Sequence, residues 1–157
     1  MIKIGSLKVT DVSKYHRLIG LVIKNTSYYS LLARKKEIAG YSLKWLQAGI
    51  KNPKRILLCA KDDDKVAGFL FGYISTGMLH LIWLGIDPNY RKLGIGQNLI
   101  LKAESWARIK KVHKIWFDTR VNNKQSISLV IKMRYHKAAL LKKHYYGQDF
   151  FIWDKLL

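Results

Sequence analysis

The spacing of apolar and polar residues predicts a strand and then helices in the first third of the chain. Residues 2–9 (IKIGSLKV) alternate as in a strand, and residues 10–23 (TDVSKYHRLIGLVI) have the apolar spacing of an amphipathic helix. We expect Thr10 or Asp11 to cap that helix. Residues 28–50 mix spacings of three and four, which predicts one helix or a broken pair of helices.

An antiparallel meander is predicted next. The apolar, β-favouring runs at 55–61 and 66–75 flank the acidic turn 62–65 (DDDK), a pattern typical of a hairpin. Residues 77–87 (GMLHLIWLGID) continue as a third strand.

The rest of the chain predicts a crossover and two closing strands. A helix from about Gly94 to Lys110 precedes a strand at 113–120 and a short helix at 123–134. Strand-like segments around a turn at Gly147 end the chain. Hairpins followed by a strand, helix, strand crossover indicate a mixed α/β (α+β) fold. With 157 residues and no linker or repeat, we expect a single domain over residues 1–157.

Composition adds a strong positive charge to this picture. The net charge is +19, from 29 Lys and Arg against 10 Asp and Glu, which attracts polyanions such as CoA, nucleic acids and acidic proteins. A merely solvated basic surface has the same composition, so we expect any nucleic-acid binding to be weak and nonspecific. No apolar run resembles a signal peptide or a membrane span, so we expect a cytoplasmic protein without a membrane partner, either a monomer or a homodimer.

The single cysteine offers little chemistry. Cys59 lies in the apolar run RILLCA and has no second cysteine with which to form an internal disulfide. It also lacks the neighbouring cysteine and histidine residues of a zinc site, and we expect no metal. We interpret Cys59 as a core residue of a strand.

A glycine-containing loop is the strongest candidate for a binding site. In the segment IDPNYRKLGIG, the basic Arg91 and Lys92 are followed by Gly94 and Gly96, and an apolar helix begins there. The first N–H groups of a helix have no partner within the helix, and glycines let phosphate oxygens approach the backbone. The segment therefore predicts a pyrophosphate site.

Two common nucleotide motifs do not fit this loop. A dinucleotide fingerprint requires a third glycine where Leu99 stands. A P-loop requires Lys and Ser or Thr after its last glycine, but Gln97 and Asn98 follow Gly96.

RKLGIG, at residues 91–96, matches the Arg/Gln-x-x-Gly-x-Gly/Ala pattern of the GNAT N-acetyltransferase superfamily. Residues 79–96 resemble the fourth strand and pyrophosphate loop of that family. Residues 123–135 (NKQSISLVIKMRY) resemble its Asn-containing helix, and residues 145–157 resemble its closing strand. The resemblance covers roughly the last two-thirds of the chain.

The resemblance implies a GNAT-like fold with a mixed sheet of six or seven strands, splayed between the fourth and fifth strands and flanked by helices. It also implies acetyl-CoA as co-substrate, held in that opening. The backbone of Leu84, Gly85 and Ile86 is then expected to pair with the pantetheine arm, and Asn123 to contact the cofactor. The implied pyrophosphate ligands are the Arg91 side chain and the N–H groups of Lys92, Leu93, Gly94, Ile95, Gly96 and Gln97.

The resemblance further implies direct acetyl transfer to a primary amine. A backbone N–H near Leu84 is the expected oxyanion donor. Strand alternation places His80, Leu84 and Ile86 on one side, and His80 stands where family members often carry the group that takes the proton of the amine, so it is the candidate base.

The residue at the position of the general acid differs from the family pattern. Val130 replaces the usual tyrosine that protonates the thiolate, and Arg134 replaces a usual glycine. Tyr135, Tyr145 or Tyr146 are candidate substitutes, and water is another.

The acceptor class stays open at this stage. A basic protein attracts acidic segments better than polyamines, which favours a protein acceptor with an N-terminal or lysine amine. A small-molecule amine is the first alternative. Val130 and the charge of +19 motivate a second one, a CoA-binding or nucleic-acid-binding module on the same fold with weakened catalysis.

Overall fold

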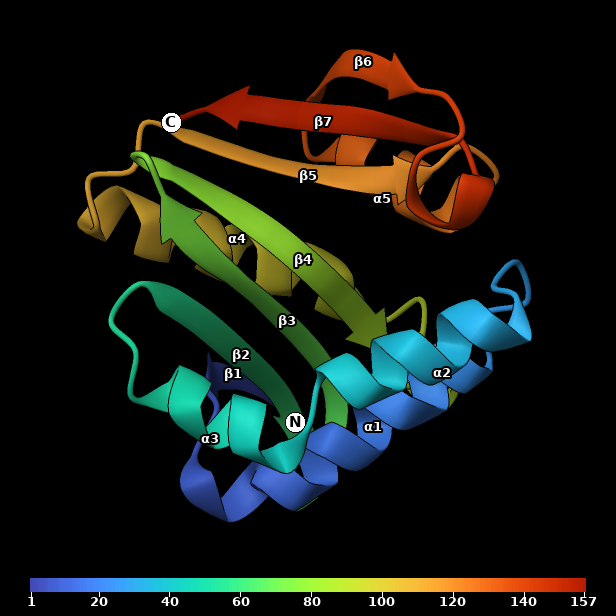
Figure 1. The fold of residues 1–157 in the computed structure, drawn as a ribbon. Coiled ribbons are helices and arrows are strands. Elements are labelled where there is room, and N and C mark those ends of the chain that lie inside the picture. The colour runs from blue at the N-terminus through green and yellow to red at the C-terminus, as the bar shows by residue number, and fades with distance from the viewer.

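A seven-stranded mixed sheet carries the fold, and helices cover both of its faces (Figure 1). The computed structural model describes all 157 residues. The strand order is β1-β2-β3-β4-β5-β7-β6; β4 and β5 are parallel, and the other neighbours are antiparallel. The strands are β1 (Ile2–Ser6), β2 (Arg55–Asp62), β3 (Lys65–Ser75), β4 (Met78–Ile86), β5 (Lys114–Arg120), β6 (His136–Leu141) and β7 (Phe150–Leu156). The helices are α1 (Val12–Lys24), α2 (Leu31–Gly40), α3 (Leu43–Ile50), α4 (Ile95–Ile109) and α5 (Lys124–Lys132), with short 3-10 turns at η1 (Val9–Asp11), η2 (Pro88–Tyr90) and η3 (Tyr145–Gly147).

The predicted order of elements is confirmed, and the mixed spacing of residues 28–50 corresponds to the broken pair α2 and α3. Each of these helices begins at a serine: the Ser30 side chain accepts from the Ala33 N–H, and the Ser42 side chain accepts from the Trp45 N–H. These local caps explain why two helices form in place of one.

Asp11 occupies the predicted N-cap position of α1, but no side chain caps the helix. Residues 9–11 form the turn η1, and Asp11 already has helical dihedral angles, so neither its side chain nor that of Thr10 caps the helix. The Asp11 carboxylate instead pairs with Lys61 at 3.0 Å, which ties η1 to the end of β2.

Two apolar clusters, one on each face of the sheet, form the core. The first lies between the sheet and α4 and includes Leu79, Leu81 and Leu99. The second lies under α1 and α3 and includes Phe69 and Cys59. Cys59 is buried in this cluster, which confirms its predicted core role, and this burial raises the pKa of its thiol to about 12.

A β-bulge interrupts the alternation of β4. Phe71 of β3 is opposite Trp83, but the next residue, Gly72, is opposite Leu81, so Ile82 is an extra residue in β4. Glycine is required at this point because a Cβ on Gly72 would lie 2.3 Å from the carbonyl oxygen of His80.

The bulge changes which side chains share a face. Leu79 and Leu81 belong to the cluster under α4, so His80, which stands between them, points to the opposite face. Leu84 nevertheless packs against the α4 cluster, because the extra residue reverses the alternation. The prediction that His80 and Leu84 share one side is therefore wrong.

The sheet opens between β4 and β5. Only three residue pairs join these strands, Met78 with Lys114, Leu79 with Ile115 and His80 with Trp116. Beyond them the two strands diverge as a V (Figure 1), which confirms the predicted splay. None of the five helices combines the length and apolar content needed to cross a membrane.

Candidate active site

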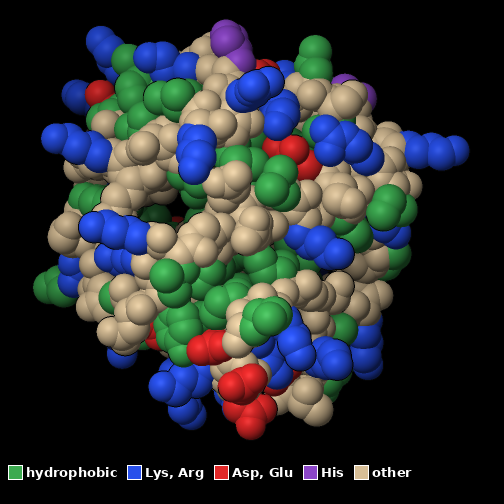
Figure 2. Space-filling view, turned by 180° about the vertical axis from the view of Figure 1, so that it is seen from behind, with side chains coloured by type: hydrophobic (Ala, Val, Ile, Leu, Met, Phe, Trp, Pro, Cys, Tyr) green, Lys and Arg blue, Asp and Glu red, His purple; other side chains and the backbone are tan.

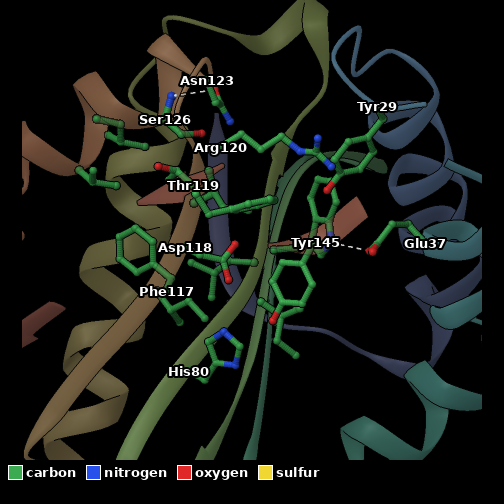
Figure 3. Close-up of a pocket in the computed structure, with 18 of the residues that line it drawn as sticks. Tyr29, Glu37, His80, Phe117, Asp118, Thr119, Arg120, Asn123, Ser126 and Tyr145 are labelled. Carbon is green, nitrogen blue, oxygen red and sulfur yellow. Dashed lines mark hydrogen bonds between the residues drawn. The ribbon is translucent and has the colours of Figure 1, made fainter. Parts of the chain in front are cut away.

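A cavity of about 310 Å³ occupies the opening between β4 and β5. Viewed from the α4 side, the surface is hollowed where the two strands diverge (Figure 2). Side chains from both faces of the sheet meet in this cavity (Figure 3). Its polar lining residues are Glu37, His80, Asp118, Thr119, Arg120, Asn123, Ser126 and the tyrosines at 28, 29, 41, 145 and 146.

The glycine loop presents a row of free backbone donors beside this cavity. Gly94 begins α4 with left-handed dihedral angles (φ 76°, ψ 2°), and no side chain caps the helix. The first N–H of α4 with a backbone acceptor is that of Asn98, which donates to the Gly94 carbonyl at 3.0 Å. The six N–H groups of residues 92–97 donate to no acceptor in the protein.

This loop fits a diphosphate. Six neighbouring donors at the positive end of a helix form an anion site, and the exposed Arg91 and Lys92 add two positive charges. The predicted geometry of the loop is therefore present, while the assignment of its residues to the cofactor stays a prediction.

The N-terminus of α4 lies against the cavity wall. A Cβ on Gly96 would be 3.1 Å from Cδ2 of Leu129 and 3.7 Å from Cδ2 of Leu84, both of which line the cavity. Asn123 also lines the cavity, and its side chain accepts from the Ser126 N–H at 3.2 Å, so it caps α5 as well.

The edge of β4 that faces β5 is unpaired beyond His80. Leu84, Gly85 and Ile86 pair with β3 on their other side, and no strand occupies the β5 side. Leu84 lines the cavity from this edge. An extended chain, such as a pantetheine arm, can add to an unpaired edge through backbone hydrogen bonds.

His80 lies in an aromatic environment that favours its neutral form. Its ring stacks on Trp116 at 3.8 Å between centroids, Tyr73 packs edge-on against it, and its Nδ1 has no hydrogen-bond partner. Burial lowers the pKa of His80 to about 4. His80 is therefore neutral at physiological pH, and it binds protons weakly.

Asp118 is a functional candidate that the sequence analysis missed. It is on β5, two residues beyond Trp116, and its carboxylate points into the cavity (Figure 3). Burial raises the pKa of Asp118 to about 6, an effect partly opposed by His144 and Arg120. A carboxylate with this pKa is suited to proton transfer near neutral pH. The signal for Asp118 in the sequence was a single acidic residue within the apolar strand segment IWFDTR.

Glu37, which the sequence analysis also missed, closes the opposite side of the cavity. Its carboxylate accepts from the Tyr41 hydroxyl at 3.2 Å, from Nε1 of Trp83 at 3.2 Å and from the Tyr146 hydroxyl at 3.0 Å. These bonds join α2, β4 and η3. The only signal in the sequence was one acidic residue within the basic segment ARKKEIAG.

The structure separates the candidate general acids. Val130 lines the cavity as a buried apolar side chain. Tyr135 is buried in the core under α4, outside the cavity, which removes it as a candidate. Tyr145 and Tyr146 do line the cavity, and burial raises the pKa of both, so each keeps its proton at neutral pH.

Basic side chains are spread widely over the surface. On the face seen in Figure 2, Lys and Arg are scattered around the whole outline, and several acidic side chains gather near the lower edge. This distribution produces a general positive field and no single basic stripe on that face.

Comparisons with known proteins agree with this geometry. A model of the acetyltransferase (GNAT) family matches residues 22–133. An uncharacterized N-acetyltransferase of Methanocaldococcus jannaschii is 32% identical over 92 residues, which cover 57% of this chain and 59% of that protein. The ribosomal protein bS18-alanine N-acetyltransferase of Escherichia coli K12 is 22% identical over 87 residues, which cover 55% and 59%. The chain thus matches about three-fifths of the length of these curated relatives.

Solved structures share the fold over the whole chain. PaiA N-acetyltransferase from Thermoplasma acidophilum, crystallised in complex with coenzyme A, superposes with a TM-score of 0.89 at 23% identity and covers 100% of this chain and 99% of that one. The ribosomal-protein-S18-alanine N-acetyltransferase from Escherichia coli superposes with a TM-score of 0.77 at 17% identity, over 99% and 94%. At these identities the likeness establishes the fold.

Proposed function

Because the chain belongs to the GNAT acetyltransferase family, we propose that it transfers an acetyl group from acetyl-CoA directly to a primary amine, and that the acceptor is a protein. One observation carries the proposal: the cavity between β4 and β5 is lined by the buried carboxylate of Asp118, and its wall residues Leu84 and Leu129 lie against Gly96, in the loop with the free N–H groups of residues 92–97. Acetyl-CoA, when bound, supplies an activated acetyl thioester.

The residues of the chain then have distinct tasks. The N–H groups of residues 92–97 and Arg91 hold the diphosphate, and the unpaired edge of β4 from Leu84 to Ile86 aligns the pantetheine arm. The backbone near Leu84 donates to the thioester oxygen. Asn123 fixes the start of α5 beside the cofactor.

Asp118 is the proposed proton acceptor for the amine. An amine must lose its proton to attack a carbonyl carbon, and an efficient base has a pKa near the working pH. The pKa of Asp118, about 6, meets this condition better than the pKa of His80, about 4. We assign His80 the role of packing against Trp116 and shaping the floor of the cavity. Tyr145 is the proposed proton donor to the thiolate, since it lines the same cavity as Asp118.

Two observations favour a protein acceptor. The charge of +19 attracts acidic polypeptide segments and repels polycations. A matched relative also acts, by its name, on an alanine of a ribosomal protein.

Binding of acetyl-CoA is the first test of the proposal. A ligand at about 100 times its Kd adds roughly 2.7 kcal/mol to the free energy of unfolding, so the melting temperature is expected to rise by several degrees. Differential scanning fluorimetry with and without acetyl-CoA measures the shift. CoA is expected to produce a similar shift and adenosine a much smaller one, since adenosine lacks the diphosphate. No shift at millimolar acetyl-CoA contradicts the proposal.

A further inference from the structure

The cavity contains a buried positive charge without an anionic partner. Arg120, at the end of β5, has only 3% of its surface exposed. Its Nη1 donates to the Tyr28 carbonyl at 3.3 Å, whereas Nε and Nη2 have no acceptor. No carboxylate lies within 4.0 Å of the guanidinium group, although Glu37 and Asp118 line the same cavity.

Aromatic rings surround this guanidinium group. Its Cζ atom is 3.8 Å from the ring centroid of Tyr29, 5.5 Å from that of Tyr28 and 5.2 Å from that of Phe150. Ring faces attract a cation and hold it in place. They do not accept hydrogen bonds from its in-plane N–H groups. Leaving a buried donor without an acceptor costs about 1 to 3 kcal/mol, and more when the group is charged. An anion with two acceptor oxygens would satisfy both free donors.

Arg120 lies close to Asp118, the proposed base, so an anion bound at Arg120 would lie next to the acceptor amine. Arg120 and Asp118 are two residues apart on one strand, so their side chains share a face and their Cα atoms are about 6.6 Å apart. Figure 3 shows both side chains at the cavity, with Arg120 extended toward Tyr29. This is the face of His80 and Trp116, opposite the face covered by α4. An acceptor amine at Asp118 thus places the neighbouring part of the same molecule at Arg120.

We propose that Arg120 binds a carboxylate of the acceptor, so that the preferred substrates carry a carboxylate close to the reacting amine. This inference rests on the proposed acetyl transfer. A planar guanidinium fork binds a carboxylate through two parallel hydrogen bonds, which suits the two free donors Nε and Nη2. The carboxylate belongs either to a free amino acid or to an acidic residue near the N-terminus of a peptide.

Calorimetry on the unmodified protein, saturated with CoA, tests the proposal without requiring turnover. The first pair of ligands is alanine and alaninamide. The second pair is two peptide amides, one beginning alanine-glutamate and the other alanine-glutamine. Within each pair the amine is the same and only the carboxylate differs.

We expect the carboxylate-bearing member of one pair to bind about tenfold more tightly. A preference in the first pair identifies an amino acid as the source, and one in the second pair identifies an acidic peptide. Equal binding, or no binding, in both pairs overturns the proposal.

Variants of Arg120 show whether this residue causes the preference for carboxylate-bearing ligands. We expect Arg120→Met to abolish the tenfold preference, and Arg120→Lys, which keeps the charge without the fork, to retain a weaker one. Gln148→Leu is the matched control, because Gln148 donates to the same Tyr28 carbonyl at 3.1 Å and its loss leaves the guanidinium group in place. If Arg120→Met does not fold, Arg120→Lys carries the comparison.

Three results separate the possible failures. Loss of CoA affinity in the Arg120 variants, with the acceptor preference retained, assigns the residue to the cofactor and overturns the proposal. An equal loss of preference in Gln148→Leu assigns the effect to the Tyr28 loop and also overturns it. Transfer assays with the same ligands address the proposed function separately: no transfer to any amine, with the carboxylate preference intact, contradicts acetyl transfer and leaves the anion site standing.

Discussion

Replacing Asp118 with asparagine is expected to lower turnover by at least about a hundredfold and, at the same time, to stabilise the protein. The catalytic loss follows because asparagine has nearly the same shape and cannot accept the proton of the amine, and a positioned general base typically contributes a hundredfold or more. Steady-state kinetics at pH 7.5 measures the loss. The affinity for acetyl-CoA is expected to change little, because Asp118 is not among the residues proposed to hold the cofactor.

The gain in stability follows from the raised pKa of Asp118. Folding raises this pKa from 3.8 to about 6, so the carboxylate form is less stable in the folded protein than in the unfolded chain. The resulting destabilisation is complete above about pH 6 and disappears as the pH falls toward 4. Replacing the carboxylate by the neutral asparagine amide is expected to raise the free energy of unfolding at pH 7.5 by up to about 3 kcal/mol. Urea unfolding at pH 7.5 and at pH 4 measures the difference.

The pH profile and a control variant complete this test. Wild-type kcat/KM is expected to decline below about pH 6, where Asp118 takes up a proton, and the residual activity of Asp118→Asn is expected to lack that decline. His80→Gln is the control, with an expected loss below tenfold. Wild-type turnover in Asp118→Asn contradicts the role of Asp118 as the base, and a hundredfold loss in His80→Gln alone assigns that role to His80.

Replacing Gly94 with valine is expected to weaken acetyl-CoA binding by ten- to a hundredfold. Gly94 has a φ angle of 76°, a conformation in which an L side chain is unfavourable by about 1 to 2 kcal/mol and a β-branched one by more. The loop must change shape to relieve this strain, which displaces the N–H groups of residues 92–97 from the diphosphate. Equilibrium titration well below the melting temperature measures the affinity of the folded fraction.

Gly20→Ala is a suitable control for this variant. A Cβ on Gly20 meets nothing within 4 Å, so the substitution within α1 is expected to leave acetyl-CoA affinity unchanged. Gly68→Ala is a poor control, because its Cβ would lie 2.9 Å from Cδ1 of Ile86 and 3.0 Å from Cγ2 of Ile95, beside the loop itself. Equal affinity in Gly94→Val and Gly20→Ala contradicts the role of the loop.

The sequence was informative about elements whose signals are local. Apolar spacing predicted the strands and helices in their observed order, and the glycines at 94 and 96 predicted a helix start with free donors. These features depend on near neighbours in the chain, so a sequence reveals them.

Features that depend on contacts between distant segments were not predictable in this way. The bulge at Ile82 depends on the pairing of β3 with β4, and it reversed the face assigned to His80. Glu37 and Tyr146 are 109 residues apart, and their hydrogen bond appears only when η3 folds over α2. The raised pKa of Asp118 similarly arises from burial by elements on both sides of the opening, which the strand IWFDTR alone does not reveal.

Mass spectrometry of an acceptor after incubation with the protein and acetyl-CoA tests the central claim most directly. Peptides with a free N-terminal amine, a lysine peptide and small amines form the panel, and each is also assayed with the Asp118→Asn variant. The account predicts one added acetyl group on a primary amine of a peptide, accompanied by an equal release of CoA thiol that depends on the acceptor. Heat protection by acetyl-CoA, with every acceptor unmodified and no acceptor-dependent thiol release, would contradict the account and indicate a CoA-binding module.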